Sequence, residues 1–183
     1  GIEHLGLKSK GMEEVMAVVE TNSCFSDGIQ YVSGCSFGNN ALIYRDYGKT
    51  AVTIAKRDGT GIRLYLDNYD VVANNYPEAS QLFEKVIAKR AGTTTDKKEL
   101  NKKWQQIAFE LLDYPIENLF KIEEVEIEVP DYAPIKDDKF CTQCGEKIMA
   151  GKELRINEED YCIPCAEGSY LQLDGSGLKE VKE

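Results

Sequence analysis

The feature that most constrains this chain is a pair of closely spaced cysteine motifs near its C-terminal end. Cys141 and Cys144 enclose two residues, as do Cys162 and Cys165, and seventeen residues separate the two pairs. Two C-x2-C pairs with a spacer of about 15–20 residues are typical of a structural zinc site with four thiolate ligands. We therefore predict that these four cysteines bind one zinc ion per chain, with two disulfides or a redox C-x-x-C motif as the alternatives. Because four thiolates leave no open position for water, such a site stabilises the chain and does not catalyse.

The residues around these cysteines predict a small finger of the treble-clef or zinc-ribbon type. Gly145 permits a tight turn after the first pair, and a hairpin around Asn157-Glu158-Glu159 would return the chain to the second pair. We expect the second pair to open a helix that runs through Ala166. A tail of about fifty residues is too small to fold by apolar burial alone, which favours a bound metal.

Charge limits the classes of partner. The chain has 22 basic and 32 acidic residues, and residues 131–183 hold seven basic and twelve acidic ones. This acidic balance argues against binding to nucleic acid or to an anionic membrane surface. The longest apolar run, at 15–19, is far too short for a membrane helix, and no secretory leader is visible. We expect a cytoplasmic protein without a membrane segment.

Apolar spacing predicts an α+β fold for the rest of the chain. The turn residues of 46–49 and 58–60 predict hairpins between three consecutive strands, because Asp and Gly accept the backbone angles of tight turns. The predicted elements are the end of a helix at 2–8, a buried strand at 14–21, a helix at 26–33 with Ile29 and Val32 on its apolar face and Gly34 at its end, strands at 41–46, 50–57 and 61–68, helices beginning at Pro77 and Asp96, and a strand at 121–129.

Two prolines and mixed charge mark residues 130–139 as a connection between two parts of the chain. We predict a core at 1–130, a linker at 131–139, and the finger with its tail at 140–183.

Two further cysteines, Cys24 and Cys35, lie where a predicted strand passes into a helix and out again. A helix N-terminus favours the thiolate form, so Cys24 is placed to act as a metal ligand or a nucleophile. The alternative is that both are buried free thiols that fill space as small apolar groups. Near Cys24, Asp27 and Gln30 are the polar side chains we would place in a functional pocket, although a helix N-cap is a sufficient role for Asp27.

The same region resembles a known family, the FmdE (FwdE-like) family of formylmethanofuran dehydrogenase subunits. The C-terminal finger is similar to the one appended to many of its members. The residues that carry the resemblance are Val18-Val19-Glu20-Thr21-Asn22, Cys24, Asp27-Gly28-Ile29-Gln30, Gly34-Cys35-Ser36, Gly38 and Asp46-Tyr47-Gly48-Lys49.

The resemblance implies an α-β-α-β-β-β core with a mixed sheet like that of the catalytic domain of glyceraldehyde-3-phosphate dehydrogenases. It also implies a homodimer and a second transition metal in the core. In the family that metal uses a His-x-His motif at the start of the first helix and the cysteine that matches Cys24. This chain has a single histidine, His4, and no His-x-His motif, so Cys24 and Cys35 are the candidate ligands that remain.

Three functions stay open from these residues. The first, which the resemblance implies, is a metal-binding accessory or regulatory protein that joins a larger oxidoreductase whose other subunits carry the chemistry. The second is an enzyme that uses Cys24 as a metal ligand or nucleophile in a small-molecule redox or transfer reaction. The third is a zinc-finger regulator of nucleic acid, which the acidic charge disfavours.

Overall fold

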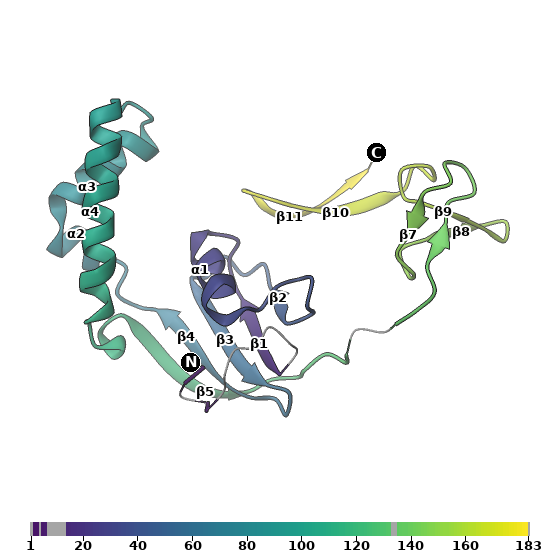
Figure 1. The fold of residues 1–183 in the computed structure, drawn as a ribbon, viewed down its shortest axis with the longest axis horizontal. Coiled ribbons are helices and arrows are strands. Elements are labelled where there is room, and N and C mark those ends of the chain that lie inside the picture. Colours follow the sequence, from purple (N-terminus) through teal and green to yellow (C-terminus); the bar gives the residue numbers. More distant parts are fainter. Residues whose placement is uncertain (1, 4, 7–13, 133–134, 183) are drawn as a thin grey trace. The chain divides into compact units, whose positions relative to one another are not determined.

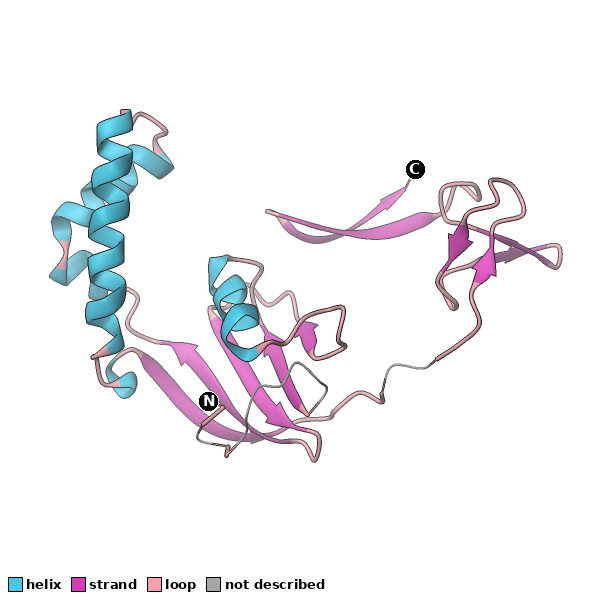
Figure 2. Cartoon of the chain, viewed as in Figure 1, coloured by secondary structure: helices cyan, strands magenta, loops and turns pink. Residues whose placement is uncertain are grey.

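The computed structural model describes residues 2–3, 5–6, 14–132 and 135–182 (Figure 1). The chain forms two compact units, one of Gly1–Gly61 with Glu126–Glu183 and the other of Ile62–Val125. Figure 2 shows strands in both units and most of the helical residues in the second unit, which confirms the predicted α+β class. Of the predicted helix end at 2–8, residues 2–3 and 5–6 form turns and not a helix, and residues 4, 7 and 8 lie outside the described residues.

The first unit is organised around strand β1 (Val15–Val19), in which all five residues are buried. It pairs in parallel with β2 (Leu42–Tyr44) and antiparallel with β3 (Ala51–Lys56). A strand with neighbours on both edges and cover on its faces needs an unbroken apolar sequence, and VMAVV supplies one. The mixed sheet that the resemblance implies is therefore present.

Helix α1 (Cys24–Ser33) connects β1 to the parallel strand β2. It ends as predicted at Gly34, which adopts φ 72° and donates its N–H to the Gln30 carbonyl. The predicted apolar face is wrong, because Val32 is exposed and the buried positions are Ser26 and Ser33. The two hydroxyls donate to carbonyls of the local backbone, which lets short polar side chains lie in the interior.

The predicted hairpin at 46–49 is also wrong, since β1 lies between β2 and β3. The connecting residues cross the end of β1 instead. Arg45 donates its N–H to the Val19 carbonyl and Lys49 donates to that of Glu20. The helical crossover makes β1 and β2 parallel, so β2 takes one edge of β1 and β3 takes the other.

The turn after β3 forms as predicted. Gly59 adopts φ 89°, and its N–H donates to the Lys56 carbonyl at 3.0 Å. Beyond this turn, a Cβ atom on Gly61 would lie 2.7 Å from the Ile54 carbonyl oxygen. The chain therefore needs glycine at this close approach.

The second unit joins two neighbouring strands to a group of helices. The strands are β4 (Thr60–Leu66) and β5 (Phe120–Glu126). Thr60 and Gly61 of β4 and Glu126 of β5 are counted with the first unit. The helices are α2 (Val71–Asn75), α3 (Pro77–Phe83), the π-helix η1 (Glu84–Ala88), α4 (Thr94–Leu112) and the 3-10 helix η2 (Ile116–Asn118).

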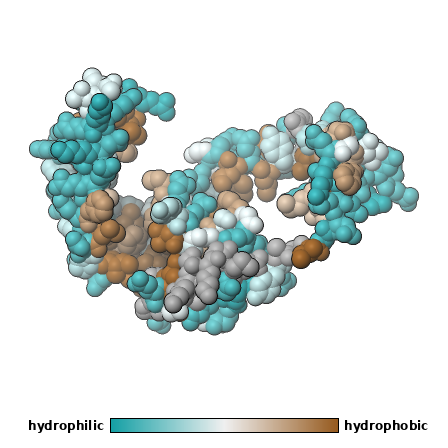
Figure 3. Space-filling view, in the orientation of Figure 1, coloured by the Kyte–Doolittle hydropathy of each residue, from teal (hydrophilic) through white to brown (hydrophobic). Residues whose placement is uncertain are grey.

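Helix α4 begins two residues earlier than predicted, because Thr93 and Asp96 form a reciprocal capping box. Its buried face carries Leu100 and Ile107, and the rings of Trp104 and Phe83 meet edge to face at 5.9 Å. The exposed face of α4 carries many charged residues and also Phe109 and Leu112, which are 72% and 78% exposed. The view of this unit in Figure 3 is largely hydrophilic. No helix in the described part of the chain is long and apolar enough to cross a membrane.

Three short hairpins complete the first unit: β6 (Lys139–Phe140) with β7 (Lys147–Ile148), β8 (Leu154–Ile156) with β9 (Glu159–Tyr161), and β10 (Ser169–Asp174) with β11 (Gly177–Lys182). The tip of the last hairpin contacts the loop after β2. Leu178 donates its N–H to the Asp46 carboxylate at 2.8 Å, and Gly177 adopts φ 102° beside it. Asp46 also accepts the Tyr44 hydroxyl at 2.6 Å.

Candidate metal centre

The first cysteine pair lies on a tight turn between β6 and β7. Cys141 donates its N–H to the Glu146 carbonyl, and Gly145 donates back to the Cys141 carbonyl, both at 2.9 Å. Gly145 adopts φ 74°, which a residue with a side chain rarely reaches. The turn that the sequence predicted therefore forms, and it brings two sulfurs to one side of the chain.

The second pair lies on a similar turn after β9. Ala166 donates its N–H to the Cys162 carbonyl, and Gly168 donates to that of Ile163, both at 3.0 Å. The expected helix through Ala166 is absent. Glu167 takes a left-handed φ of 49°, and the chain then enters β10. A left-handed residue ends a helical turn, so the finger is of the ribbon type and lacks the helix of a treble clef.

The two turns are held together through the hairpin between them. Asn157 and Glu158 have φ of 51° and 68°, which gives the tight turn expected of a two-residue hairpin loop. The N–H of Thr142 donates to the Asp160 carbonyl at 2.8 Å, which ties the first cysteine turn to β9. The predicted hairpin at 157–159 is confirmed.

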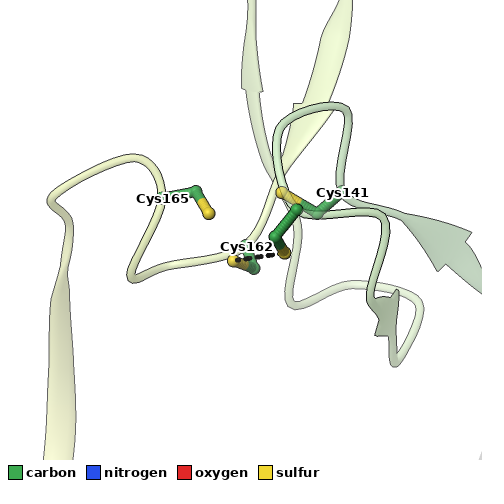
Figure 4. A group of neighbouring side chains, drawn as sticks. Cys141, Cys162 and Cys165 are labelled. Carbon is green, nitrogen blue, oxygen red and sulfur yellow. Dashed lines mark hydrogen bonds between the residues drawn. The ribbon is translucent and has the colours of Figure 1, made fainter.

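The four sulfur atoms converge, as Figure 4 shows for part of the cluster. All lie within 4.8 Å of one another, and those of Cys144 and Cys162 are 3.9 Å apart. Zinc–sulfur bonds of about 2.3 Å give a tetrahedron whose edges are about 3.8 Å, so the donor set fits a zinc ion. All the cysteines are free thiols here, which does not support the disulfide alternative.

The thiols of the cluster have unequal acidity. Hydrogen bonding from the Cys144 backbone, and then from that of Cys162, lowers the pKa of Cys141 to about 6. The pKa of Cys165 rises to about 12, first because its sulfur shares a hydrogen bond with that of Cys162. Without a metal, the four cysteines are thus not all thiolates near neutral pH. The positive charge of a bound divalent cation stabilises all four in the thiolate form.

The structure does not bring Cys24 and Cys35 together. Cys24 is exposed at the first position of α1, and Cys35 is buried beyond the last. Ten helical residues span roughly 15 Å, too far for two ligands of one ion. Cys35 donates its thiol to the Val15 carbonyl, and burial raises its pKa. This is the space-filling role that the sequence left open for it.

In the described part of the chain, the four C-terminal cysteines are the one group able to hold a metal. A second metal in the core is therefore not supported, and His4 lies outside the described residues. Asp27 is not the N-cap of α1, because Ser23 occupies that position.

Sequence reasoning missed Gly168, which passes close to Leu154 beside the second cysteine turn. A Cβ atom there would lie 2.6 Å from a methyl carbon of Leu154. The signal was the glycine shortly after each cysteine pair, at 145 and 168.

Comparison with known proteins finds two separate family matches. Residues 1–121 match the family described as FmdE, molybdenum formylmethanofuran dehydrogenase operon. Residues 138–171 match the prokaryotic dksA/traR C4-type zinc finger. The second match identifies the four-cysteine cluster as a zinc-binding site.

Two similar proteins extend the comparison. A probable S-adenosyl-L-methionine-binding protein of Archaeoglobus fulgidus is 41% identical over 97% of this chain, which spans 47% of that protein's length. The crystal structure of a tungsten formylmethanofuran dehydrogenase FmdE-like protein from Syntrophus aciditrophicus has a TM-score of 0.51 and 22% identity, covering 88% of this chain and 76% of that one. The second similarity concerns the fold alone.

The family match covers more than half of the sequence, and the solved structure has the same fold. The chain belongs to the FmdE family and carries a C4-type zinc finger at its C-terminal end.

Proposed function

We propose that this chain is an accessory protein in which a zinc-stabilised finger and an FmdE-type core present surfaces to a partner. The observation that carries the proposal is the convergence of four thiol sulfurs within 4.8 Å. Four thiolates complete the coordination of zinc, so the metal organises the finger and leaves no position for a substrate. The proposal includes the division into a core at 1–130, a linker at 131–139 and a finger at 140–183.

Exposed apolar side chains on α1 and the loop after it support a protein partner. Tyr31 is 89% exposed, Val32 71% and Phe37 62%. Large apolar groups that cluster in the sequence and face solvent are typical of protein–protein contact surfaces. The partner we propose is a second copy of the chain or a larger oxidoreductase in the cytoplasm.

The test is to isolate the tagged full-length chain from its native cells and identify what comes with it. We expect an oxidoreductase subunit, or a homodimer by light scattering. The double substitution Tyr31→Ser with Val32→Ser should abolish the association, and Tyr47→Ser, at an exposed tyrosine outside α1, should retain it. A monomer with no specific partner, or equal loss with both variants, would contradict the proposal.

An enzyme that uses Cys24 is the second candidate, because this thiol is exposed at the first position of a ten-residue helix. Aligned backbone dipoles favour an anionic group at that position. Iodoacetamide should then alkylate Cys24 faster than a free cysteine derivative near neutral pH, and Cys24→Ser should remove the fast phase. A rate equal to that of the free thiol would rule this candidate out.

The name of the archaeal relative adds a ligand to test. Since this chain corresponds to 47% of that protein, binding of S-adenosylmethionine by the shared part is a proposal. Calorimetric titration of the zinc-loaded chain with S-adenosylmethionine tests it. Saturable heat would support binding within these residues, and its absence would exclude it.

A further inference from the structure

The chain carries one strongly basic segment despite its acidic composition. Residues 85–103 hold seven lysine or arginine residues and two acidic residues, a net charge of +5 in a chain of −10. This segment spans η1, the loop after it and the first half of α4. A local net charge opposite in sign to that of the whole chain, and of this size, attracts anions to the surface of the segment.

A groove lies within this segment. It has a volume of about 530 Å³ and is lined by Val86, Ile87, Arg90, Lys97, Leu100 and Asn101. Its volume falls within the range of about 300–1,000 Å³ that small-molecule sites occupy. Val86 and Leu100 are buried and form an apolar floor, whereas the charged side chains stand at the exposed rim.

The backbone around the groove is unusual at three neighbouring places. The π-helix η1 forms one wall, and Lys89 closes it by donating its N–H to the Glu84 carbonyl. Arg90 adopts φ 51°, which costs a non-glycine residue energy. Gly92 then passes so close to Val86 that a Cβ atom would lie 2.6 Å from a methyl carbon. Wide helical turns and strained residues are frequent at functional sites.

The cations of this segment differ in their partners. Lys85 pairs with Asp96 at 2.8 Å, Lys89 with Glu84 at 2.9 Å and Lys103 with Glu78 at 2.7 Å. Arg90 and Lys97, the two that line the groove, have no carboxylate partner among the residues that the structure describes. Their charge is therefore available to a ligand.

We propose that this groove binds a small organic anion. Arg90 and Lys97 hold its carboxylate or phosphate group, Asn101 donates a hydrogen bond, and a short apolar body lies against Ile87 and Leu100. A guanidinium presents paired donors that match both kinds of oxyanion. A nucleic acid would need a longer track of cations than the two that line the groove, and Lys85 and Lys89 beside them are already paired with carboxylates.

The test is an NMR titration of the isotope-labelled, zinc-loaded full chain with phenyl phosphate and with phenylacetate. Benzyl alcohol is the uncharged control. We expect the amide signals of Arg90, Lys97 and Asn101 to shift together and saturate with both anions, and not with benzyl alcohol. The ratio of the two dissociation constants shows which of the two oxyanions the groove prefers.

Matched variants make the test specific. Arg90→Asn removes the guanidinium and places asparagine, which tolerates positive φ, at this position. The double variant combines Arg90→Asn with Lys97→Gln. The double variant should raise the dissociation constant by about tenfold or more. Lys98→Gln, which removes an exposed charge of α4 outside the groove, should leave it within about twofold.

Several results would overturn the proposal: no saturation with either anion, shifts scattered over lysines elsewhere, equal weakening by Lys98→Gln, or equal binding of benzyl alcohol. If Arg90→Asn disrupts the helices, Arg90→Gly replaces it, since glycine adopts the same backbone angle without strain.

Discussion

The sulfur atoms of Cys144 and Cys162, eighteen positions apart in the sequence, lie 3.9 Å from each other, near the edge length of a zinc–thiolate tetrahedron. The purified chain should therefore contain one zinc ion, and Cys162→Ser should lose it and unfold the finger. Elemental analysis and the dispersion of amide NMR signals measure the two effects. Cys24→Ser, at an exposed cysteine outside the cluster, should keep the metal. Full zinc content in Cys162→Ser would contradict the four-thiolate site.

Two glycines should respond oppositely to a methyl group. At Gly61 a Cβ atom would lie 2.7 Å from the Ile54 carbonyl oxygen, and at Gly28, inside α1, it would meet nothing within 4 Å. Gly61→Ala should lower the free energy of unfolding by about 1–3 kcal/mol through overpacking. Gly28→Ala should raise it by up to about 1 kcal/mol through helix propensity. Urea denaturation measures both, and equal effects would show that the close approach at Gly61 is absent.

The contact between the last hairpin and the loop after β2 should depend on one carboxylate. Asp46→Ala removes the acceptor of the Leu178 N–H, so hydrogen exchange at that amide should become faster. Gly177→Ala should have the same effect, because its Cβ atom would lie 2.7 Å from an Asp46 oxygen. Asp131→Ala, at an exposed carboxylate of the same unit, is the control. Unchanged exchange at Leu178 in both variants would disprove the contact.

The capping box of α4 should contribute to stability in a pH-dependent way. Thr93→Ala removes the hydroxyl that accepts the Asp96 N–H and should cost about 1 kcal/mol. Hydrogen bonds from Lys85, and then from the Thr93 backbone and hydroxyl, lower the pKa of Asp96 to about 2.

Because the folded pKa of Asp96 is below its unfolded value, its contribution is complete above about pH 4 and is lost as the pH falls toward 2. Asp96→Asn should thus be less stable than the parent chain at neutral pH, and the difference in urea midpoint should shrink across that acid range. A difference that stays constant down to pH 2 would contradict this role of Asp96.

The parts of the structure that the sequence predicted well depend on local chemistry. The cysteine spacing predicted the convergence of four sulfurs because a C-x2-C turn allows few geometries. The buried strand β1 followed from an apolar run bounded by polar residues, and the end of α1 from a glycine suited to positive φ.

The failures concern pairing between distant segments. Asp46-Tyr47-Gly48-Lys49 has the composition of a hairpin turn, yet β2 and β3 flank β1 on opposite edges. Local turn chemistry does not show whether a third strand lies between the two strands that the turn connects. Tertiary packing decides that, because it places the helical crossover that brings β2 beside β1. The helix expected after Cys165 failed for a local reason, since Glu167 takes left-handed angles that end the turn.

The basic groove was missed because charge was summed over long windows. The windows were the whole chain and residues 131–183, and in the total of −10 the net charge of +5 on residues 85–103 is lost. A shorter window would have detected the charge, but the wide turn that shapes the groove has no sequence signature that we recognise.

The π-helix at Glu84–Ala88 has a consequence for comparison among related chains. A π turn holds one residue more than an α turn, and such turns occur mostly as single-turn bulges within helices. Removing one residue between Phe83 and Lys89 would restore a regular α-helix and rotate the position of Arg90 by about 100° about the helix axis. A one-residue gap at this place in another member of the family would therefore mark a protein that has lost the anion groove while keeping the fold.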